Sequence, residues 1–460
     1  MRARALWVLL GLYLAARLVI VFRGVVFTSY DSFSYAHRTD PTLNRGPLVS
    51  FFGHAPRLWG VPLFYALFPN DAARAYGQWA LGTIAWAALA VVVFHLLRHP
   101  VARILGSAGV LVVALTTQVG SWDFAILSES LSISLGVLTL ALFLWWLSTN
   151  SRASLIGFIA IGVWWTFTRP DIRVFIVAVV VALVTTAIRL RDRRRAALVA
   201  AGILVLGMGW CTAIGSVADR TYQASYSEIG IDEGFMYQLR LQVLPDPTIK
   251  QIFQQKLGMP ECPAADAVAA DSVWRINDFT AAYRSCPDLA AWGTQHRGTA
   301  MFEFAKVAPT TYAGMIGGIF QTTLVGAHYA QIPSVLPKVV NWLVFPPDRF
   351  APLATLAALV LALAAAIATR ARRLTWAAGL GAASLVSAVA TAMLGVGEFA
   401  RFGVQEAIGL RVAILLLAVL ALDAVLNRRA VGSSAPSSPA KEWENVDADR
   451  SSRGGVPSQE

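Results

Sequence analysis

The sequence is short of charged residues. Only 14% of its 460 residues are Asp, Glu, Lys or Arg, whereas 56% are hydrophobic, and the mean hydropathy is +0.58. A soluble domain of ordinary composition carries roughly a quarter charged residues. The deficit excludes a disordered chain, a fibrous repeat and a typical cytosolic enzyme, and it predicts a polytopic membrane protein.

Lysine and the common catalytic motifs are also scarce. Lysine occurs only at 250, 256, 306, 338 and 441, so arginine supplies most of the net charge of +11. The chain has no P-loop, no glycine-rich phosphate cradle, no HExxH and no Ser/His/Asp spacing. Nothing in the sequence therefore indicates that the protein uses cytosolic ATP. No nucleic-acid partner is expected either, because most of the arginines lie in short connections between apolar runs, where they report membrane topology.

Long apolar runs are what the sequence has in place of charge. A helix that crosses a bilayer needs about 20 mostly apolar residues, because lipid offers no partner for backbone N–H and C=O groups. Such runs lie at 5–22, 77–97, 104–119, 126–147, 154–168, 172–190, 196–217, 351–369, 374–396 and 404–426. The runs 104–119 and 154–168 are short for a full crossing. The expected fold class is an all-α polytopic membrane protein with about ten transmembrane helices.

Arginine marks alternate connections between these runs. Basic residues gather at 2–4, 98–103, 152, 189–195, 370–373 and 428–429. Residues 118–125 contain none, and 397–407 contain only Arg401. Cytoplasmic loops collect Arg and Lys, so both termini are predicted to be cytoplasmic. The first run lacks a small-residue cleavage site, so it is expected to be an uncleaved signal-anchor.

Four parts are expected along the chain. They are an N-terminal transmembrane bundle (1–217) with a first exterior loop (23–76), a large exterior loop or small domain (218–350), C-terminal transmembrane helices (351–429) and a disordered cytoplasmic tail (430–460). Apolar patches at 58–68, 311–327 and 332–346 suit amphipathic helices at the membrane interface of the two exterior loops. A pair of extra crossings within 307–346 is the alternative.

Two of the three cysteines lie in the large exterior loop. Cys262 and Cys286 are 24 residues apart, each beside a proline. On the oxidising side of a membrane such a pair predicts a disulfide that ties a loop with a small core. No histidine lies near enough in sequence to complete a zinc site, so no metal ligands are predicted.

Ionisable groups at span ends are the candidates for chemistry, because charge is costly there. The candidates on the expected exterior side are Asp31, His54, Glu129, Arg169, Glu398 and Arg401. A carboxylate can deprotonate an acceptor hydroxyl, and arginines can neutralise a phosphate. Structural alternatives stay open: a solvated Asp31, interhelical hydrogen bonds from Glu129, an Arg169–Asp171 pair and a local Glu398–Arg401 pair.

Together these residues resemble the GT-C superfamily of membrane glycosyltransferases, which includes protein O-mannosyltransferases, lipid A aminoarabinose transferase and cell-wall arabinosyltransferases. The matching segments are Tyr30-Asp31-Ser32 after the first run, the Pro-containing amphipathic stretch 56–65, Ser128-Glu129-Ser130-Leu131, Arg169-Pro170, and Glu398-Phe399-Ala400-Arg401-Phe402 before the last run. The resemblance covers most of residues 1–430 as an arrangement, and the order and spacing of the motifs carry it. Each motif alone is short.

The resemblance implies a transfer on the extracytoplasmic face of a bacterial plasma membrane. The donor would be a polyprenyl-phosphate-linked sugar and the acceptor a hydroxyl of an envelope glycan, lipid or protein, with inversion. Asp31 would be the general base. Arg169 and Arg401 would bind the leaving phosphate, and Glu129 or Glu398 would orient the sugar hydroxyls or those arginines. His54 lies in none of the matching segments and is a substrate-binding candidate only as an ionisable residue of the first exterior loop.

Three points stay open at this level. Many GT-C members have a second acid in the first loop, whereas Ser32 follows Asp31 here. This departure counts against a metal-dependent mechanism, and a divalent cation, Mg or Mn, is the one cofactor left open. Two other functions are compatible with the sequence: a multi-pass transporter or lipid flippase, and a non-catalytic scaffold with a GT-C-like bundle.

Overall fold

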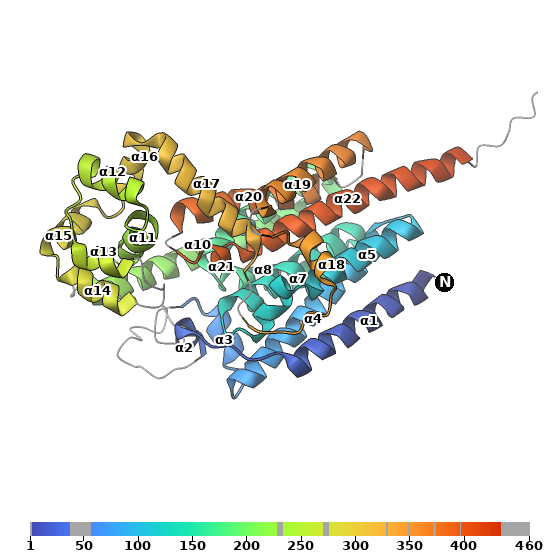
Figure 1. Ribbon diagram of the computed structural model, residues 1–460. Helices are drawn as coiled ribbons and strands as arrows, with labels where there is room; N and C mark the ends of the chain where they lie inside the picture. Colours follow the sequence, from blue (N-terminus) through green and yellow to red (C-terminus); the bar gives the residue numbers. More distant parts are fainter. Residues whose placement is uncertain are drawn as a thin grey trace, which may run out of the picture.

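The protein is described here by a computed structural model. It describes residues 2–36, 57–227, 233–269, 276–327, 330–347, 350–370, 374–395 and 397–433. Almost all of these residues are helical and no strand is present among them; Phe27 and Ala125 form one isolated parallel bridge. The predicted all-α class is confirmed (Figure 1).

Ten long helices make up the bundle. They are α1 (Arg2–Arg23), α4 (Asp71–Leu96), α5 (Pro100–Leu115), α7 (Ser128–Thr149), α8 (Arg152–Thr166), α9 (Arg173–Arg189), α10 (Arg194–Ser227), α19 (Ala351–Ala368), α20 (Leu374–Leu394) and α22 (Val404–Ser433). Short elements in their connections are α2 (Tyr30–Ala36), α3 (Gly60–Tyr65), α6 (Thr117–Gly120), η1 (Ser121–Phe124), η2 (Pro170–Ile172), η3 (Arg191–Arg193), α18 (Lys338–Val344) and α21 (Phe399–Phe402).

Eight helices of the described chain are long and apolar enough to cross a membrane. A ninth crossing results if α5 and the α6–η1 segment, which bend by 57° relative to each other, are counted together. Helix α8 is shorter and apolar. Each of the ten predicted runs therefore falls on a helix, and the two runs expected to be short are the two outside the eight. The protein is a polytopic membrane protein.

The two ends of the bundle differ. The N-terminus and the last turns of α22 lie at one end, and the helices between α10 and α17 (Pro309–Val325) lie at the other (Figure 1). Arginine-rich turns meet at the first end: the Arg98 N–H donates to Asp423 Oδ1 at 2.9 Å, and Arg193 donates to the carbonyl of Leu147 at 2.6 Å. We call these the terminal end and the second-core end.

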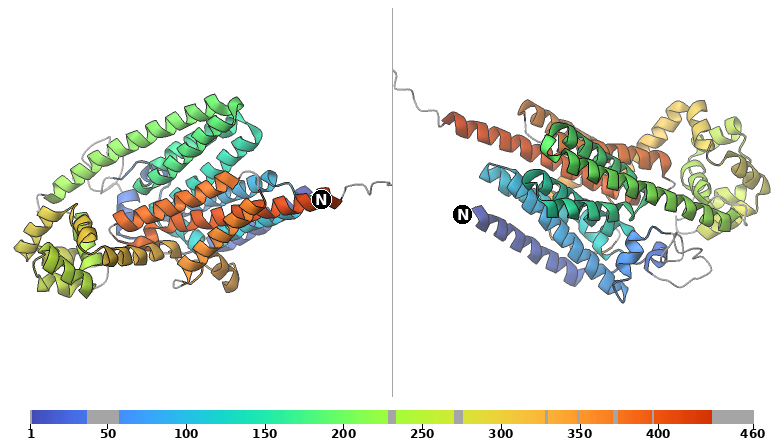
Figure 2. Two further views of the ribbon diagram at one scale, coloured as in Figure 1. Left: turned by 90° about the horizontal axis from the view of Figure 1, so that it is seen from above. Right: turned by 180° about the vertical axis from the view of Figure 1, so that it is seen from behind.

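Two helix boundaries differ from the predicted ones for local reasons. Helix α4 begins at Asp71, inside the expected loop, because Asn70 Oδ1 accepts a hydrogen bond from the Ala73 N–H at 2.9 Å and caps the helix. Helix α10 continues past residue 217 to Ser227, since no glycine or proline interrupts the last eleven residues, 217–227. It thereby reaches from the bundle to the next group of helices (Figure 2).

Residues 235–308 build a core separate from that of the bundle, which we call the second core. Its elements are α11 (Glu233–Gln238), the π-helix η4 (Leu239–Val243), α12 (Pro247–Leu257), α13 (Pro263–Ala269), α14 (Ile276–Arg284), α15 (Pro287–His296) and α16 (Ala300–Val307). Its most buried aromatic side chains are Phe253, Phe279 and Phe304. Such a core needs no lipid, because it buries its own apolar surface.

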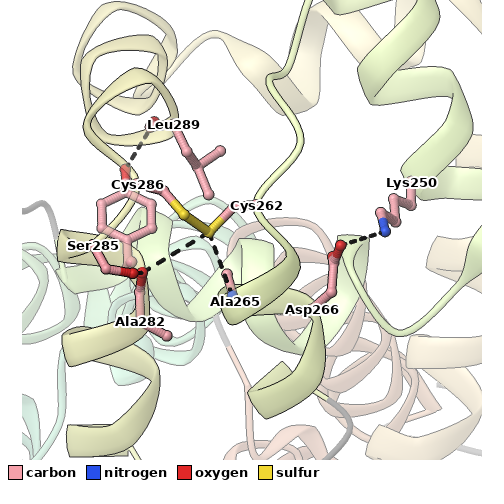
Figure 3. The surroundings of a disulfide bond; sticks show 9 residues. Lys250, Cys262, Ala265, Asp266, Ala282, Ser285, Cys286 and Leu289 are labelled. Carbon is pink, nitrogen blue, oxygen red and sulfur yellow. Dashed lines mark hydrogen bonds and ion pairs between the residues drawn. A yellow bond between two sulfur atoms is a disulfide. The ribbon is translucent and has the colours of Figure 1, made fainter.

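The predicted disulfide between Cys262 and Cys286 is present. It joins the start of α13 to the start of α15, with a Cα–Cα distance of 6.0 Å (Figure 3). Nearby, Lys250 on α12 pairs with Asp266 on α13 at 2.7 Å. The disulfide therefore links two helices of the second core across a sequence separation of 24 residues.

No pair of crossings lies in the described part of 307–346. Helix α17 has 17 residues and packs on α20, α21 and α22, and α18 has only seven. The chain between them lies along the bundle, since the Trp122 indole donates to the Ala327 carbonyl at 3.1 Å. Arg411 on α22 holds both ends of this segment by donating to the carbonyls of Leu324 (2.8 Å) and Val344 (3.1 Å).

Candidate functional site

The candidate residues come from four separate connections at the second-core end. Asp31 is in the first turn of α2, Glu129 in the first turn of α7, and Arg169 directly precedes η2. Glu398 and Arg401 are the residue before α21 and a residue within it. The structure brings all five together, although Asp31 and Arg401 are 370 positions apart. His54 lies outside the described residues.

Arg401 is the centre of the cluster. Its Nε donates to Glu129 Oε1 at 2.7 Å, and its Nη1 donates to Asp31 Oδ2 at 2.8 Å and to Glu398 Oε2 at 2.7 Å. The side chain is only 5% exposed. The predicted local pair between Glu398 and Arg401 therefore exists, but it is one of three ion pairs on the same guanidinium.

Arg169 extends the network through Glu129. Its Nη1 donates to Glu129 Oε1 at 2.7 Å, so one carboxylate oxygen serves two arginines. Its Nε and Nη2 donate to the two oxygens of Asp171 at 3.0 and 2.8 Å, a bidentate pair. Glu129 is thus an interhelical link and part of the cluster at once.

Arg57 belongs to the cluster although it is not among the residues predicted from the sequence. Its Nη2 donates to Asp31 Oδ1 at 3.0 Å, and its Nε donates to the Ser34 hydroxyl at 2.7 Å. The guanidinium lies 4.6 Å from the centre of the Tyr35 ring. Arg57 is the one basic residue in the amphipathic stretch 56–65, and this isolated charge is the sequence signal that could have identified it as a site residue.

The cluster contains three arginines and four carboxylates, and it is open on one side. Glu129 is fully buried, whereas the side chains of Asp31, Asp171 and Glu398 are 31%, 24% and 23% exposed. Buried charges are stable only when they are paired and hydrogen-bonded. The acids on the open side can therefore exchange a paired arginine for another ligand, while Glu129 cannot without leaving a buried charge unpaired.

The arginines also set the acidity of Asp31. Burial by itself raises the pKa of this carboxyl, but the charges of Arg57 and Arg401 outweigh burial, so its pKa lies below the ordinary value. For Arg401 and Arg169 burial lowers the pKa, but the adjacent carboxylates raise it by more, so the pKa of each lies above its ordinary value and both stay protonated. Asp31 is an ionised but weak base as long as both arginines hold it.

A divalent cation does not fit the carboxylates as they stand. Among the described residues no three His, Cys, Asp or Glu side chains are grouped closely enough to hold a metal ion. Both oxygens of Asp31 accept hydrogen bonds from arginines, and so does Glu129 Oε1. The donor set is that of an arginine network, because guanidinium groups already neutralise the oxygens that a cation would need.

An apolar cavity of about 620 Å³ begins about one helical turn from this cluster. Gln405 and Trp165 line it, and both make hydrogen bonds to Ser132, one turn along α7 from Glu129. It extends between α7, α9, α20 and α22 to Trp376 near the terminal end. Six of its lining residues are exposed, namely Val177 and Val181 on α9 and Thr375, Gly379, Ala382 and Val386 on α20. The cavity therefore opens sideways.

A second charged pair lies close by in sequence but serves the fold. Asp123 on η1 pairs with Arg17 on α1 at 2.6 Å, and both side chains are buried. Ser130 donates to Asp123 and Arg17 donates to Thr83, at 2.8 and 2.9 Å. The pair is satisfied from all sides by helix residues, so it links α1, α4 and α7.

No protein-family model, no curated protein and no solved structure matches the chain. The geometry of the cluster and the cavity is therefore the ground on which a function is inferred.

Proposed function

We propose that the protein is an integral membrane glycosyltransferase that moves a sugar from a polyprenyl-phosphate donor to an acceptor hydroxyl, with inversion. One observation carries this proposal. Asp31, Glu129, Arg169, Glu398 and Arg401 form a single arginine–carboxylate network, and an apolar cavity that opens sideways begins about one helical turn away, at Ile133 and Gln405. A prenyl phosphate needs both features close together, because its phosphate needs cations and its prenyl chain needs an apolar space.

The cavity suits the lipid part of such a donor. Its lining is mostly Val, Leu, Ile, Ala and Phe, and it opens between α9 and α20, where a prenyl chain can enter from the bilayer. Burial of apolar surface contributes about 25 cal/mol per Å². The phosphate at the end of the chain would then lie at the second-core end, near Arg401.

The partly exposed arginine contacts suit the phosphate. In our mechanism Arg57 and Arg401 leave Asp31 and bind the donor phosphate instead. Each of these arginines contacts Asp31 through a single hydrogen bond. Arg169 stays with Glu129 and Asp171 and supports the network. Because two cations leave Asp31, its pKa rises toward the ordinary value and it becomes a better base.

The chemical step is a single displacement. Asp31 accepts the proton of the acceptor hydroxyl, and the acceptor oxygen attacks the anomeric carbon. The bond from that carbon to the phosphate oxygen breaks, and its electron pair leaves with the lipid phosphate, which Arg401 and Arg57 stabilise. One displacement inverts the anomeric centre.

We place this reaction on the extracytoplasmic face of a bacterial plasma membrane. The support is the position of the arginine-rich turns at the terminal end, opposite the cluster, together with the tendency of basic loops to stay in the cytoplasm. Nucleotide sugars are absent from the far side of that membrane, so the donor must be delivered through the bilayer.

A reconstituted transfer assay tests the proposal. The purified protein in vesicles is given labelled polyprenyl-phosphate hexoses and pentoses and a fraction of envelope acceptors. Arg401→Lys keeps the charge but loses the forked geometry, so transfer should fall by about 10²-fold or more. Arg284→Lys, an exposed arginine of the second core, is the matched control. Normal transfer by Arg401→Lys, or no transfer by the unchanged protein with every donor, contradicts the proposal.

One observation favours a transporter or lipid flippase as the second candidate. The bend of 57° between α5 and the α6–η1 segment is of the kind found in the broken helices of transport proteins. This function predicts that a labelled polyprenyl phosphate changes leaflet in sealed vesicles without any sugar transfer. A non-catalytic scaffold predicts neither activity.

A further inference from the structure

The junction between the second core and the loop before α21 is a feature that the proposed reaction does not use. Gln242 on η4 donates from Nε2 to the carbonyl of Gly395 at 3.1 Å. Leu241 on the same element packs so closely on Gly397 that a Cβ there would lie 2.5 Å from Leu241 Cδ1. The second core thus touches the loop on both sides of residue 396.

The loop it touches is strained. Glu398 has φ 46° and ψ 37°, a left-handed conformation that residues other than glycine rarely adopt. Strain of this kind persists only where the surroundings hold it, and it concentrates at functional sites. In this conformation the Glu398 carbonyl accepts hydrogen bonds from the N–H groups of Arg401 (2.8 Å) and Phe402 (3.0 Å).

The element that makes the contact is itself irregular. Leu239–Val243 is a π-helix, in which one extra residue is accommodated in a turn, and such turns are frequent at functional sites. Leu239 and Val243 are fully buried in the second core. Of the three residues between them, Leu241 and Gln242 reach the loop instead. The π-helix therefore joins a rigid core to a strained loop.

We propose that Leu241 and Gln242 are positioning residues for Arg401. They hold the loop at Gly395 and Gly397, and the loop holds Glu398 in the left-handed conformation that sets its carboxylate 2.7 Å from Arg401. When this contact is lost, Glu398 relaxes and Arg401 loses one of its three carboxylates. The consequence for transfer rests on the proposed function; the positioning of the loop does not.

Hydrogen exchange measured by mass spectrometry tests the positioning directly. In Gln242→Leu the amides of residues 401–403, which donate to the carbonyls of Glu398 and Phe399, should exchange about tenfold faster, as expected for one lost hydrogen bond. The control is Gln251→Leu, an exposed glutamine of α12. Exchange at 401–403 that is unchanged, or that rises together with that of the second-core peptides, overturns the proposal.

Two further variants probe the packing of Leu241 on the loop. Leu241→Ala removes the side chain that packs on Gly397, and Gly397→Ala forces that side chain to move, so each variant should also raise exchange at 401–403. Unchanged exchange at 401–403 in either variant counts against positioning.

A transfer assay then separates the two proposals. In Gln242→Leu, kcat should fall by up to about 10²-fold, as expected for a misplaced group, while the donor KM changes little. If the unchanged protein transfers nothing, the proposed function fails while the exchange result stands. If Gln242→Leu transfers sugar at the normal rate although its amides at 401–403 exchange faster, the proposed influence of the second core on the reaction at Arg401 is overturned.

Discussion

Two clusters of arginine and carboxylate meet at the first turn of α7 and differ in access to solvent. In the Arg17–Asp123 pair both side chains are buried, at 1% and 7% exposure. In the Arg401 cluster the central arginine is as deeply buried, but Asp31 is 31% exposed. The same residue types therefore serve a sealed helix contact in one place and an accessible site in the other.

The difference lies in what surrounds the carboxylate. Asp123 is held by Arg17 and Ser130, and both come from helices of the bundle. Asp31 is held by Arg57 and Arg401, and both come from connections at the second-core end. A group on a connection can exchange its partner at lower cost than a group enclosed by helices, since removing one member of a sealed pair leaves a buried charge.

The largest expected effect is on activity at the open cluster. Asp31→Asn removes the proposed base, so transfer should fall by about 10²–10⁴-fold. The variant should still fold, because the side chain is partly exposed. The control is Asp288→Asn, an exposed acid of the second core. Initial transfer rates in vesicles measure the effect, and a loss of less than about tenfold would assign Asp31 a structural role instead.

The next effect is on stability at the sealed pair. Asp123→Ala leaves Arg17 buried without a carboxylate and should lower the free energy of unfolding by about 3–5 kcal/mol. Denaturant or thermal unfolding in mild detergent measures this loss. Adding Arg17→Met should recover most of it, because the unpaired charge is then absent. If the double variant is no more stable than Asp123→Ala, the pair does not act as a unit.

The smallest effect is the pH dependence that Asp31 contributes. Its pKa is lower in the folded protein, so its ion pairs stabilise the fold above the unfolded value of about 3.9 and lose that effect as pH falls through the folded pKa. The difference in unfolding free energy between the unchanged protein and Asp31→Asn should be at most about 1 kcal/mol at pH 7. It should shrink toward zero as the pH falls from the unfolded value through the lower pKa of the folded protein. A difference that grows on acidification contradicts this sign.

Much of the architecture follows from local properties of the chain. The ten apolar runs, the boundaries set by arginine-rich turns, and the pairing of Cys262 with Cys286 could be predicted from the sequence. Five candidate site residues also follow, because a charge at a span end is costly and therefore stands out in an apolar chain. His54, the sixth, lies outside the described residues.

Pairings across long sequence separations could not be predicted. That Arg57 shares Asp31 with Arg401, that Arg17 holds Asp123, and that Leu241 packs on Gly397 depend on how helices pack. The cavity has the same origin, since its lining comes from helices as far apart as α4 and α22. The sequence by itself determined which segments enter the membrane and which few charges stay near it, because hydropathy is local. Only the tertiary structure decided which charge neutralises which, because ion pairs form between side chains that packing brings within about 4 Å.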